Sequence, residues 1–230
     1  MLVTGLALAG AACSQEDAPA EKVAEVAEEI VEPAAEPPPL ASGKWAPQDD
    51  CGEVEGAGTF RQILSAAVRA RDTDVLIAIA ADDVNLDFGD SAGKAELRRR
   101  LEDEDRDLWG ELDALLELGC SANDQGGITI PWYFDQDFGA ADPFTAWLAA
   151  GENVPVLAGP DRAAERRAAI SWDLVEIAEF DPESDFQQVE LADETRGFVA
   201  TGSLRSLIDY RLIASSRNDR WRITSFVAGD

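Results

Sequence analysis

The chain has 230 residues and is strongly acidic: 46 Asp and Glu against 19 Lys and Arg give a formal net charge of −27 at pH 7. Such a surface repels phosphate backbones and anionic headgroups, so it disfavours nucleic-acid binding and electrostatic docking on a membrane. The chain contains no histidine, which removes Ser-His-Asp and Cys-His catalysis and histidine-ligated zinc. No apolar run approaches the roughly 18 residues of a membrane-spanning helix, so we expect a soluble folded region.

The first residues predict where the protein is delivered. Residues 1–12 read MLVTGLALAGAA, a short apolar run, and Cys13 follows directly before a polar stretch that begins at Ser14. This arrangement resembles the signal of bacterial lipoproteins. The resemblance implies a signal peptide over 1–12 and a lipid on Cys13 that anchors the protein to a membrane in the periplasm, with Ser14 slightly favouring the outer membrane. An ordinary secretory signal or a buried helix is the alternative.

The composition of residues 13–44 predicts a linker. This segment is rich in Ala, Glu and Pro, includes three consecutive prolines over 37–39, and has few aromatic or long apolar side chains. Such a stretch cannot bury a core, and its unbalanced negative charge favours an extended tether. We therefore expect a lipid-anchored acidic linker, for which a tail with no spacing role is the alternative.

The three cysteines fit an oxidising compartment. If Cys13 carries lipid, Cys51 and Cys120 remain, and a disulfide between them is the natural interpretation in the periplasm. Two separate buried thiols are the alternative. A catalytic thiol is disfavoured because no histidine is present to activate it.

Apolar periodicity predicts helices in the first part of the folded region. Residues 60–80 carry apolar side chains at three- and four-residue intervals, interrupted near 72–74, which indicates two helices with a cap at the interruption. Residues 94–118 show the same period and predict one further helix. We expect these helices to form one domain over 45–150.

The segment between these helices admits two interpretations. Apolar and polar residues alternate over 83–88, as in a half-buried strand. The polar residues Asp83, Asn85 and Asp87 also match the first three ligand positions of a calcium-binding loop. However, Phe88 occupies the position where such a loop needs Gly, and the bidentate Glu that completes such a loop is missing. The strand explains every apolar position, so we expect neither a metal site nor a cofactor.

The densest basic cluster is formed by Arg98, Arg99 and Arg100, and acidic residues follow it over 102–107. A solvated helix face with local ion pairs explains this block most simply. Contact with an anionic partner, such as a carboxylate or phosphate of the cell wall, is the alternative.

Residues 123–148 concentrate aromatic side chains among Gly and Pro. The aromatic residues are Trp132, Tyr133, Phe134, Phe138, Phe144 and Trp147. We interpret them as the filling of a seam between two substructures. In the alternative interpretation they line a cleft for sugar or peptide, with Trp132 and Tyr133 as candidate binding residues.

From residue 151 onward the pattern changes to short strands separated by turns. The strands are expected at 153–156, 169–171, 174–177, 188–191 and 197–200. Short strands at such regular spacing predict a small barrel or sandwich.

The residues of these strands are similar to those of the bacterial SH3-like domain family. The matching residues are Asn153-Val154, Pro160, Ile170, Val175, Phe186, Val189-Glu190-Leu191 and Gly197-Phe198-Val199. The resemblance implies an SH3-like β-barrel over 151–206, in a family whose members commonly bind cell-wall peptide or proteins of the envelope. It also makes Trp172 and Phe198 candidate binding residues at a groove, although the barrel core is the alternative location for Phe198.

The last residues, 207–230, predict a β-hairpin with its turn near 216–219. The SH3-like strands are already accounted for, so we expect this hairpin to return to the helical domain and pair beside 83–88. The predicted fold class is therefore α+β: a helical α+β domain completed by the C-terminal hairpin, with a small SH3-like β-barrel inserted into it. The whole layout also resembles uncharacterised SH3-domain-containing envelope proteins of bacteria.

These observations predict a non-enzymatic lipoprotein of the cell envelope that binds peptidoglycan peptide or an envelope protein through its SH3-like module. We expect no nucleic-acid partner, and we expect the lipid anchor to be the only part of the protein in the membrane. A carboxylate-dependent cell-wall hydrolase is one alternative, because Asp135, Asp137 and Asp142 lie among the aromatic residues, although their spacing selects no catalytic pair. A purely structural scaffold is the other.

Overall fold

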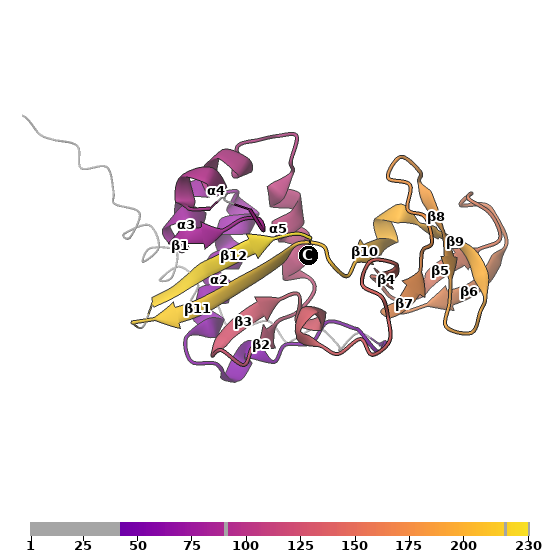
Figure 1. The fold of residues 1–230 in the computed structure, drawn as a ribbon, viewed down its shortest axis with the longest axis horizontal. Coiled ribbons are helices and arrows are strands. Elements are labelled where there is room, and N and C mark those ends of the chain that lie inside the picture. Colours follow the sequence, from indigo (N-terminus) through magenta and orange to yellow (C-terminus); the bar gives the residue numbers. More distant parts are fainter. Residues whose placement is uncertain (1–41, 90–91, 219, 230) are drawn as a thin grey trace, which may run out of the picture.

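The computed structural model describes residues 42–89, 92–218 and 220–229. The expected signal peptide over 1–12, the lipidated Cys13 and nearly all of the linker lie outside these residues. Figure 1 shows two units side by side, one with helices and a five-stranded sheet, the other with a seven-stranded sheet. The fold is therefore mixed α+β, as expected. Within the described residues no helix is long and apolar enough to cross a membrane.

Helices cover one side of the first unit. They are α2 (Ala57–Ala70), α3 (Thr73–Ala78), α4 (Lys94–Leu101) and α5 (Leu108–Leu116). The expected break at 72–74 is confirmed, because a carboxylate oxygen of Asp72 accepts a hydrogen bond from the Val75 N–H (3.0 Å) and so caps α3.

The single helix expected over 94–118 is wrong, because α4 and α5 are separate. The segment between them, 102–107, holds five acidic residues in six. Like charges at helical spacing repel one another, and Asp prefers caps to helix interiors. Asp107 takes such a position: it has a left-handed backbone (φ 42°), and its side chain accepts a hydrogen bond from the Gly110 N–H.

The five-stranded sheet has the order β1-β12-β11-β3-β2. Its strands are β1 (Ala80–Asn85), β2 (Ser121–Ala122), β3 (Gly127–Ile130), β11 (Arg211–Arg217) and β12 (Arg220–Val227). The expected hairpin is present as β11 and β12, and β12 pairs in parallel with β1. The last strand of the chain thus lies beside the first one.

The strand expected over 83–88 is displaced toward the N-terminus. It begins at Ala80 and ends at Asn85. Val84 on the strand and Leu86 just after it are buried as expected, whereas Phe88, two residues further on, is 57% exposed. The alternation was correct for two apolar residues and wrong for the third, because Asp87 and Phe88 lead into the next connection rather than continuing the ladder.

The expected disulfide is confirmed. Cys51, at the start of the 3-10 turn η1 (Cys51–Glu53), pairs with Cys120 just before β2, and their Cα atoms are 5.7 Å apart. Both cysteines are fully buried. The bond therefore ties η1 to the end of the helical region, 69 residues later.

The seven-stranded sheet has the order β10-β4-β7-β8-β9-β5-β6. Its strands are β4 (Ala146–Ala149), β5 (Val154–Leu157), β6 (Arg166–Ile170), β7 (Asp173–Glu176), β8 (Phe186–Glu190), β9 (Arg196–Ala200) and β10 (Leu204–Ser206). The five expected strands correspond to β5 to β9. The sheet also recruits β4, which precedes residue 151, because β4 pairs with both β7 and β10.

The strands of the described residues form no closed barrel, so the expected closure of the second unit is corrected. In the sheet order β6 and β10 stand at opposite edges. The sheet nevertheless encloses its own apolar cluster. That cluster consists of Ala149, Val154, Val156, Ile170, Val175, Ile177, Val189 and Val199.

Candidate binding groove

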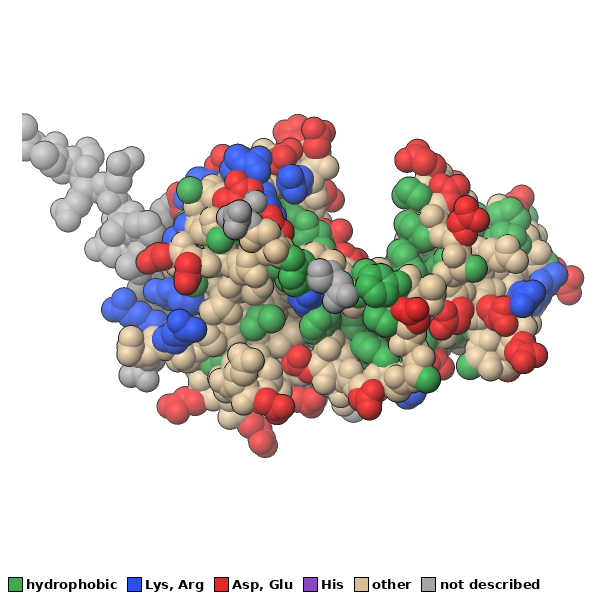
Figure 2. Space-filling model, in the orientation of Figure 1, with side chains coloured by type: hydrophobic (Ala, Val, Ile, Leu, Met, Phe, Trp, Pro, Cys, Tyr) green, Lys and Arg blue, Asp and Glu red, His purple; other side chains and the backbone are tan. Residues whose placement is uncertain are grey.

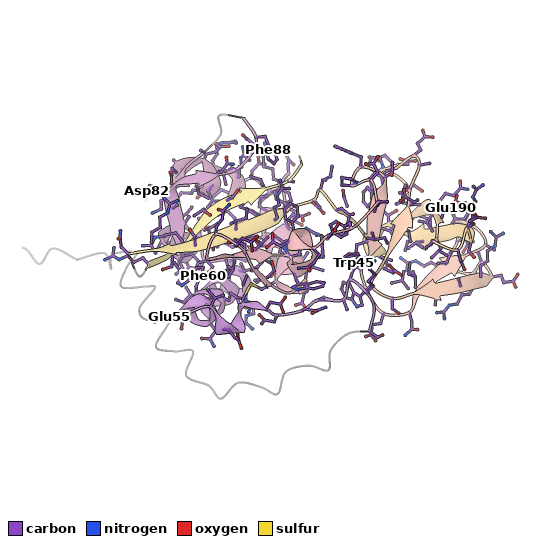
Figure 3. All side chains as sticks on the ribbon, turned by 60° about the horizontal axis from the view of Figure 1, so that its bottom comes forward. Trp45, Glu55, Phe60, Asp82, Phe88 and Glu190 are labelled. Carbon is purple, nitrogen blue, oxygen red and sulfur yellow. A yellow bond between two sulfur atoms is a disulfide. The ribbon has the colours of Figure 1, made fainter. Side chains whose placement is uncertain are left out.

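A groove of about 770 Å³ lies on the second unit. Its walls are β8, the connection from β7 to β8 over 178–184, and one side chain each from the end of β7 and from β9. Glu190, labelled in Figure 3, is the last residue of β8 and lines the groove. Concave sites of this size are typical for small ligands and for short stretches of peptide.

One buried polar side chain holds the connection over 178–184 against the sheet. Gln187 is 2% exposed, and its amide group bonds to both main-chain groups of Asp181: it accepts from the Asp181 N–H (3.0 Å) and donates to the Asp181 carbonyl (2.6 Å). The same amide donates to Thr201 Oγ1 (3.0 Å), whose hydroxyl donates to the Ser184 carbonyl (2.6 Å). Buried polar groups need hydrogen-bond partners, and the connection over 178–184 supplies most of those of Gln187. The amide therefore holds this wall of the groove in place.

An aromatic platform stands beside this wall. The Phe180 ring stacks on Trp147 of β4 with centroids 4.3 Å apart and an angle of 19° between the planes. Phe180 still exposes 38% of its surface, so part of its ring faces solvent. Figure 2 shows hydrophobic side chains gathered along the hollow between the two units. Such a rigid, half-exposed ring is suited to pack against an apolar part of a ligand.

The groove is acidic. Glu176, Glu179, Asp181 and Glu190 line it, together with a single cation, Arg196, which is bound to Glu190 at 2.7 Å. One guanidinium against four carboxylates leaves the groove with negative charge. This charge favours a ligand that carries ammonium or guanidinium groups.

The candidate binding residues from the sequence do not line this groove. Trp132 and Tyr133, in the 3-10 turn η2 (Trp132–Asp135), are 7% and 2% exposed, so they offer no stacking face. The Trp132 indole N–H donates to a carboxylate oxygen of Asp50 at 2.6 Å, while Phe138 packs on Tyr133 and on Trp45. These aromatic rings fill the interior, as the seam interpretation predicts, whereas Phe144, which that interpretation included, is 61% exposed.

Trp172 lies at the junction of the two units. Its main-chain carbonyl accepts a hydrogen bond from the Trp45 N–H (2.8 Å), and its side chain packs against the core of the first unit, where its indole nitrogen is buried without a partner. The expectation of an exposed groove aromatic is therefore corrected. Phe198 is partly buried on β9, where it lies opposite Leu157 and Gln188.

A charged network crosses the junction as well. Arg205 of β10 lies 3.6 Å from Glu111 of α5 and 3.4 Å from Asp209, and its side chain is only 10% exposed. Burial raises the pKa of Glu111, the nearby Asp209 raises it further, and Arg205 opposes both. Burial also raises the pKa of Tyr133, to about 12, against a smaller opposing effect of Arg205. These groups link the units and lie outside the groove.

The aspartates considered for catalysis serve local structure. Asp135 accepts a hydrogen bond from the Ser121 hydroxyl, Asp137 accepts one from the Gly139 N–H (2.7 Å), and Asp142 accepts one from the Phe144 N–H (3.0 Å). These bonds hold turns in place. The three carboxylates do not line the groove.

The arginine cluster on α4 is ion-paired, as predicted, but Arg100 is buried rather than solvated, and its closest contacts are not with the acidic residues over 102–107. Arg98 contacts Asp74 (2.7 Å), while Arg99 and Arg100 both contact Glu96 (2.6 and 2.7 Å). Arg100 also contacts Asp87 (2.6 Å), one of the oxygen ligands that a calcium loop would need. This contact supports the strand interpretation of 83–88 over the calcium interpretation.

The groove itself was not found from the sequence, although one signal was present. Gln187 precedes Val189 by two residues, so the alternation of β8 places its side chain on the buried face. A polar residue at a core-facing position needs internal partners and marks a fixed loop nearby.

Comparison with protein-family models, with curated proteins and with solved structures finds no match.

Proposed function

We propose that this chain is a non-enzymatic lipoprotein of the bacterial cell envelope that binds peptidoglycan peptide through its second unit. The observation that supports this function is the acidic groove with its aromatic platform, Phe180. A stem peptide of the wall offers both amine-bearing and apolar side groups, so it meets both parts of the groove. An envelope protein with a basic segment meets the same chemistry and is the second candidate.

The membership of the second unit in the SH3-like family is part of this proposal. It is supported by the positions that carry the resemblance, because Val154, Ile170, Val175, Val189 and Val199 all belong to the one apolar cluster of that sheet. The lipid anchor is supported by the apolar run before Cys13 and by the acidic linker after it. Such an anchor would keep the groove within reach of the wall.

Co-sedimentation with isolated peptidoglycan sacculi tests the proposal. The full chain is used with Cys13→Ser, so that lipid does not carry it into the pellet. We expect saturable binding that weakens about tenfold in Phe180→Ala, because an aromatic contact is worth on the order of 1.5 kcal/mol. Phe88→Ala is the matched control, since Phe88 is an exposed phenylalanine of the first unit.

A salt series separates the two contributions to binding. The carboxylates of the groove act through charge, so binding should weaken as salt rises, whereas the loss in Phe180→Ala should persist at high salt. Absence of binding at any salt concentration would reject the wall ligand and leave a protein partner as the candidate. Equal losses in Phe180→Ala and Phe88→Ala would reject the groove as the binding site.

A further inference from the structure

The open face of the five-stranded sheet carries a second pocket, with the opposite charge. It measures about 390 Å³ and lies near the tip of the β11–β12 hairpin. Its lining includes Arg217, Arg220 and Arg222, the hydroxyls of Ser215 and Thr224, and one carboxylate, Asp83. Figure 2 shows the Lys and Arg side chains gathered over this end of the sheet, in a molecule that otherwise displays mostly acidic side chains.

The register of the hairpin forces these arginines together. Arg217 lies directly opposite Arg220, and Arg222 follows two residues later on the same face, opposite Ser215. Like charges placed directly across two strands repel each other and destabilise the pair. In a chain with 46 acidic residues, a neutralising partner would be easy to supply. None of the three arginines forms an ion pair within the described residues, whereas Arg98, Arg99 and Arg100 all do.

Within the part of the chain that the structure describes, the acidic residues beside the pocket do not cancel its charge. Asp82 is bound by Lys94 at 2.8 Å, and this contact, with a smaller effect of Arg222, lowers the pKa of Asp82. Among the described residues that line the pocket, Asp83 is the one carboxylate against three guanidinium groups. The pocket keeps an excess positive charge that suits an anion with two negative charges.

The pocket is also held in place from behind. Trp221 stands between Arg220 and Arg222 and points to the other face of the sheet, where its ring stacks on Phe60 (5.7 Å) and its indole N–H donates to the Glu55 carbonyl (3.0 Å). A site on paired strands with such an anchor is preorganised, because its arginines need not be gathered when a ligand arrives.

We propose that this pocket binds a phosphate group. Guanidinium groups match phosphate oxygens with paired N–H donors, and the two hydroxyls add neutral donors. A phosphate group brings three terminal oxygens and close to two negative charges, whereas a carboxylate brings two oxygens and one charge. The pocket volume equals that of about a dozen waters at roughly 30 Å³ each, so it leaves room for the group that carries the phosphate. That group is either a free phosphate compound or the headgroup of an anionic lipid.

Calorimetric titration of the full chain carrying Cys13→Ser, with inorganic phosphate and with pyrophosphate, tests the site. We expect saturable binding that weakens at least tenfold in the double variant Arg217→Gln, Arg220→Gln. The matched control is Arg69→Gln, Arg162→Gln, which removes the same charge from two exposed arginines elsewhere. This control should stay within twofold of the parent, because net charge alone acts weakly at such distances in salt.

A second arm uses vesicles of phosphatidylcholine with and without 30% phosphatidylglycerol. Binding to the anionic vesicles alone, lost in Arg217→Gln, Arg220→Gln, would assign the phosphate to a lipid headgroup. Arg222→Gln should also weaken phosphate binding, and this variant tests the site while the cross-strand pair of Arg217 and Arg220 stays intact. The proposal is overturned if neither phosphate nor anionic vesicles bind, or if both double variants lose binding equally. The Phe180→Ala variant should leave phosphate binding unchanged, so this proposal and the groove fail separately.

Discussion

Replacement of Gln187 by Ala tests how the groove is built. The amide of Gln187 bonds to the Asp181 N–H, the Asp181 carbonyl and Thr201 Oγ1, all at 3.0 Å or less. A buried hydrogen bond contributes about 1 kcal/mol net, and loss of one partner leaves the other buried and unsatisfied. Removing these three bonds should lower the free energy of unfolding of the second unit by about 3 kcal/mol.

Urea unfolding followed by tryptophan fluorescence measures this loss, because Trp147 stacks on Phe180 beside the affected wall. Gln188→Ala is the control: Gln188 is the next residue of β8, of the same type, but exposed. Amide exchange at Asp181 should also accelerate in Gln187→Ala and not in the control. If Gln187→Ala were to unfold within about 0.5 kcal/mol of Gln188→Ala, the role assigned to this amide would be refuted, since surface substitutions cost about that much.

Three further predictions concern stability. Cys51→Ala with Cys120→Ala should lower the free energy of unfolding by about 4 kcal/mol, the chain-entropy value for a closed loop of 69 residues, as measured in denaturant. Hydrogen bonds from Arg99 and Arg100 lower the pKa of Glu96 to about 2, below its unfolded value of about 4.3. The stability from Glu96 is therefore present above pH 4.3 and lost as the pH falls toward 2, and Glu96→Gln should flatten that part of the pH–stability curve. Burial raises the pKa of Glu111 in the folded protein above its value in the unfolded chain. The free energy of unfolding should therefore fall as the pH rises from the unfolded-state pKa to the folded-state pKa, and it should fall less in Glu111→Gln.

Each of these predictions has its own contrary result. A Cys51→Ala, Cys120→Ala variant as stable as the parent would show that the disulfide does not restrict the unfolded chain. An acid limb that is unchanged by Glu96→Gln would assign the acid sensitivity to other carboxylates. If the stability of Glu111→Gln equals that of the parent at every pH, the carboxyl group of Glu111 is better solvated than its place on α5, facing Arg205 of β10, indicates.

The helices and most strands were accessible from the sequence because each has a local cause. Asp72 could be identified as a cap, and the strands of the second unit could be identified from their short apolar segments and turns. The break between α4 and α5 was missed because the apolar period continues across it, while the acidic run over 102–107 opposes helix there. The exposure of Phe88 was missed because alternation gives the face of a strand but not its end.

The two candidate sites escaped the sequence for a different reason. The groove depends on a buried amide, Gln187, whose importance appears only when the connection over 178–184 folds back onto β8. Trp172 was expected at a groove because of its position in the resemblance to the SH3-like family. The structure uses it at the junction of the two units, where it packs against the core of the first one. Sequence patterns report local preference, whereas these positions are decided by contacts between distant segments.

The basic clusters show the same limit with charge. Arg98, Arg99 and Arg100 are adjacent in the sequence, yet the fold pairs all of them: Glu96 contacts two of them from one helix turn away, and Asp74 and Asp87 contact Arg98 and Arg100. The arginines at 217, 220 and 222 are spread across a turn and attract no attention as a sequence motif. Antiparallel pairing then places them on one face of the sheet, where Asp83 of β1 is the one carboxylate among the described residues that line the pocket. The cluster that is denser in the sequence, Arg98 to Arg100, is therefore the weaker candidate for an anion site. A basic cluster is available to an anionic ligand only if the fold does not already pair its charges.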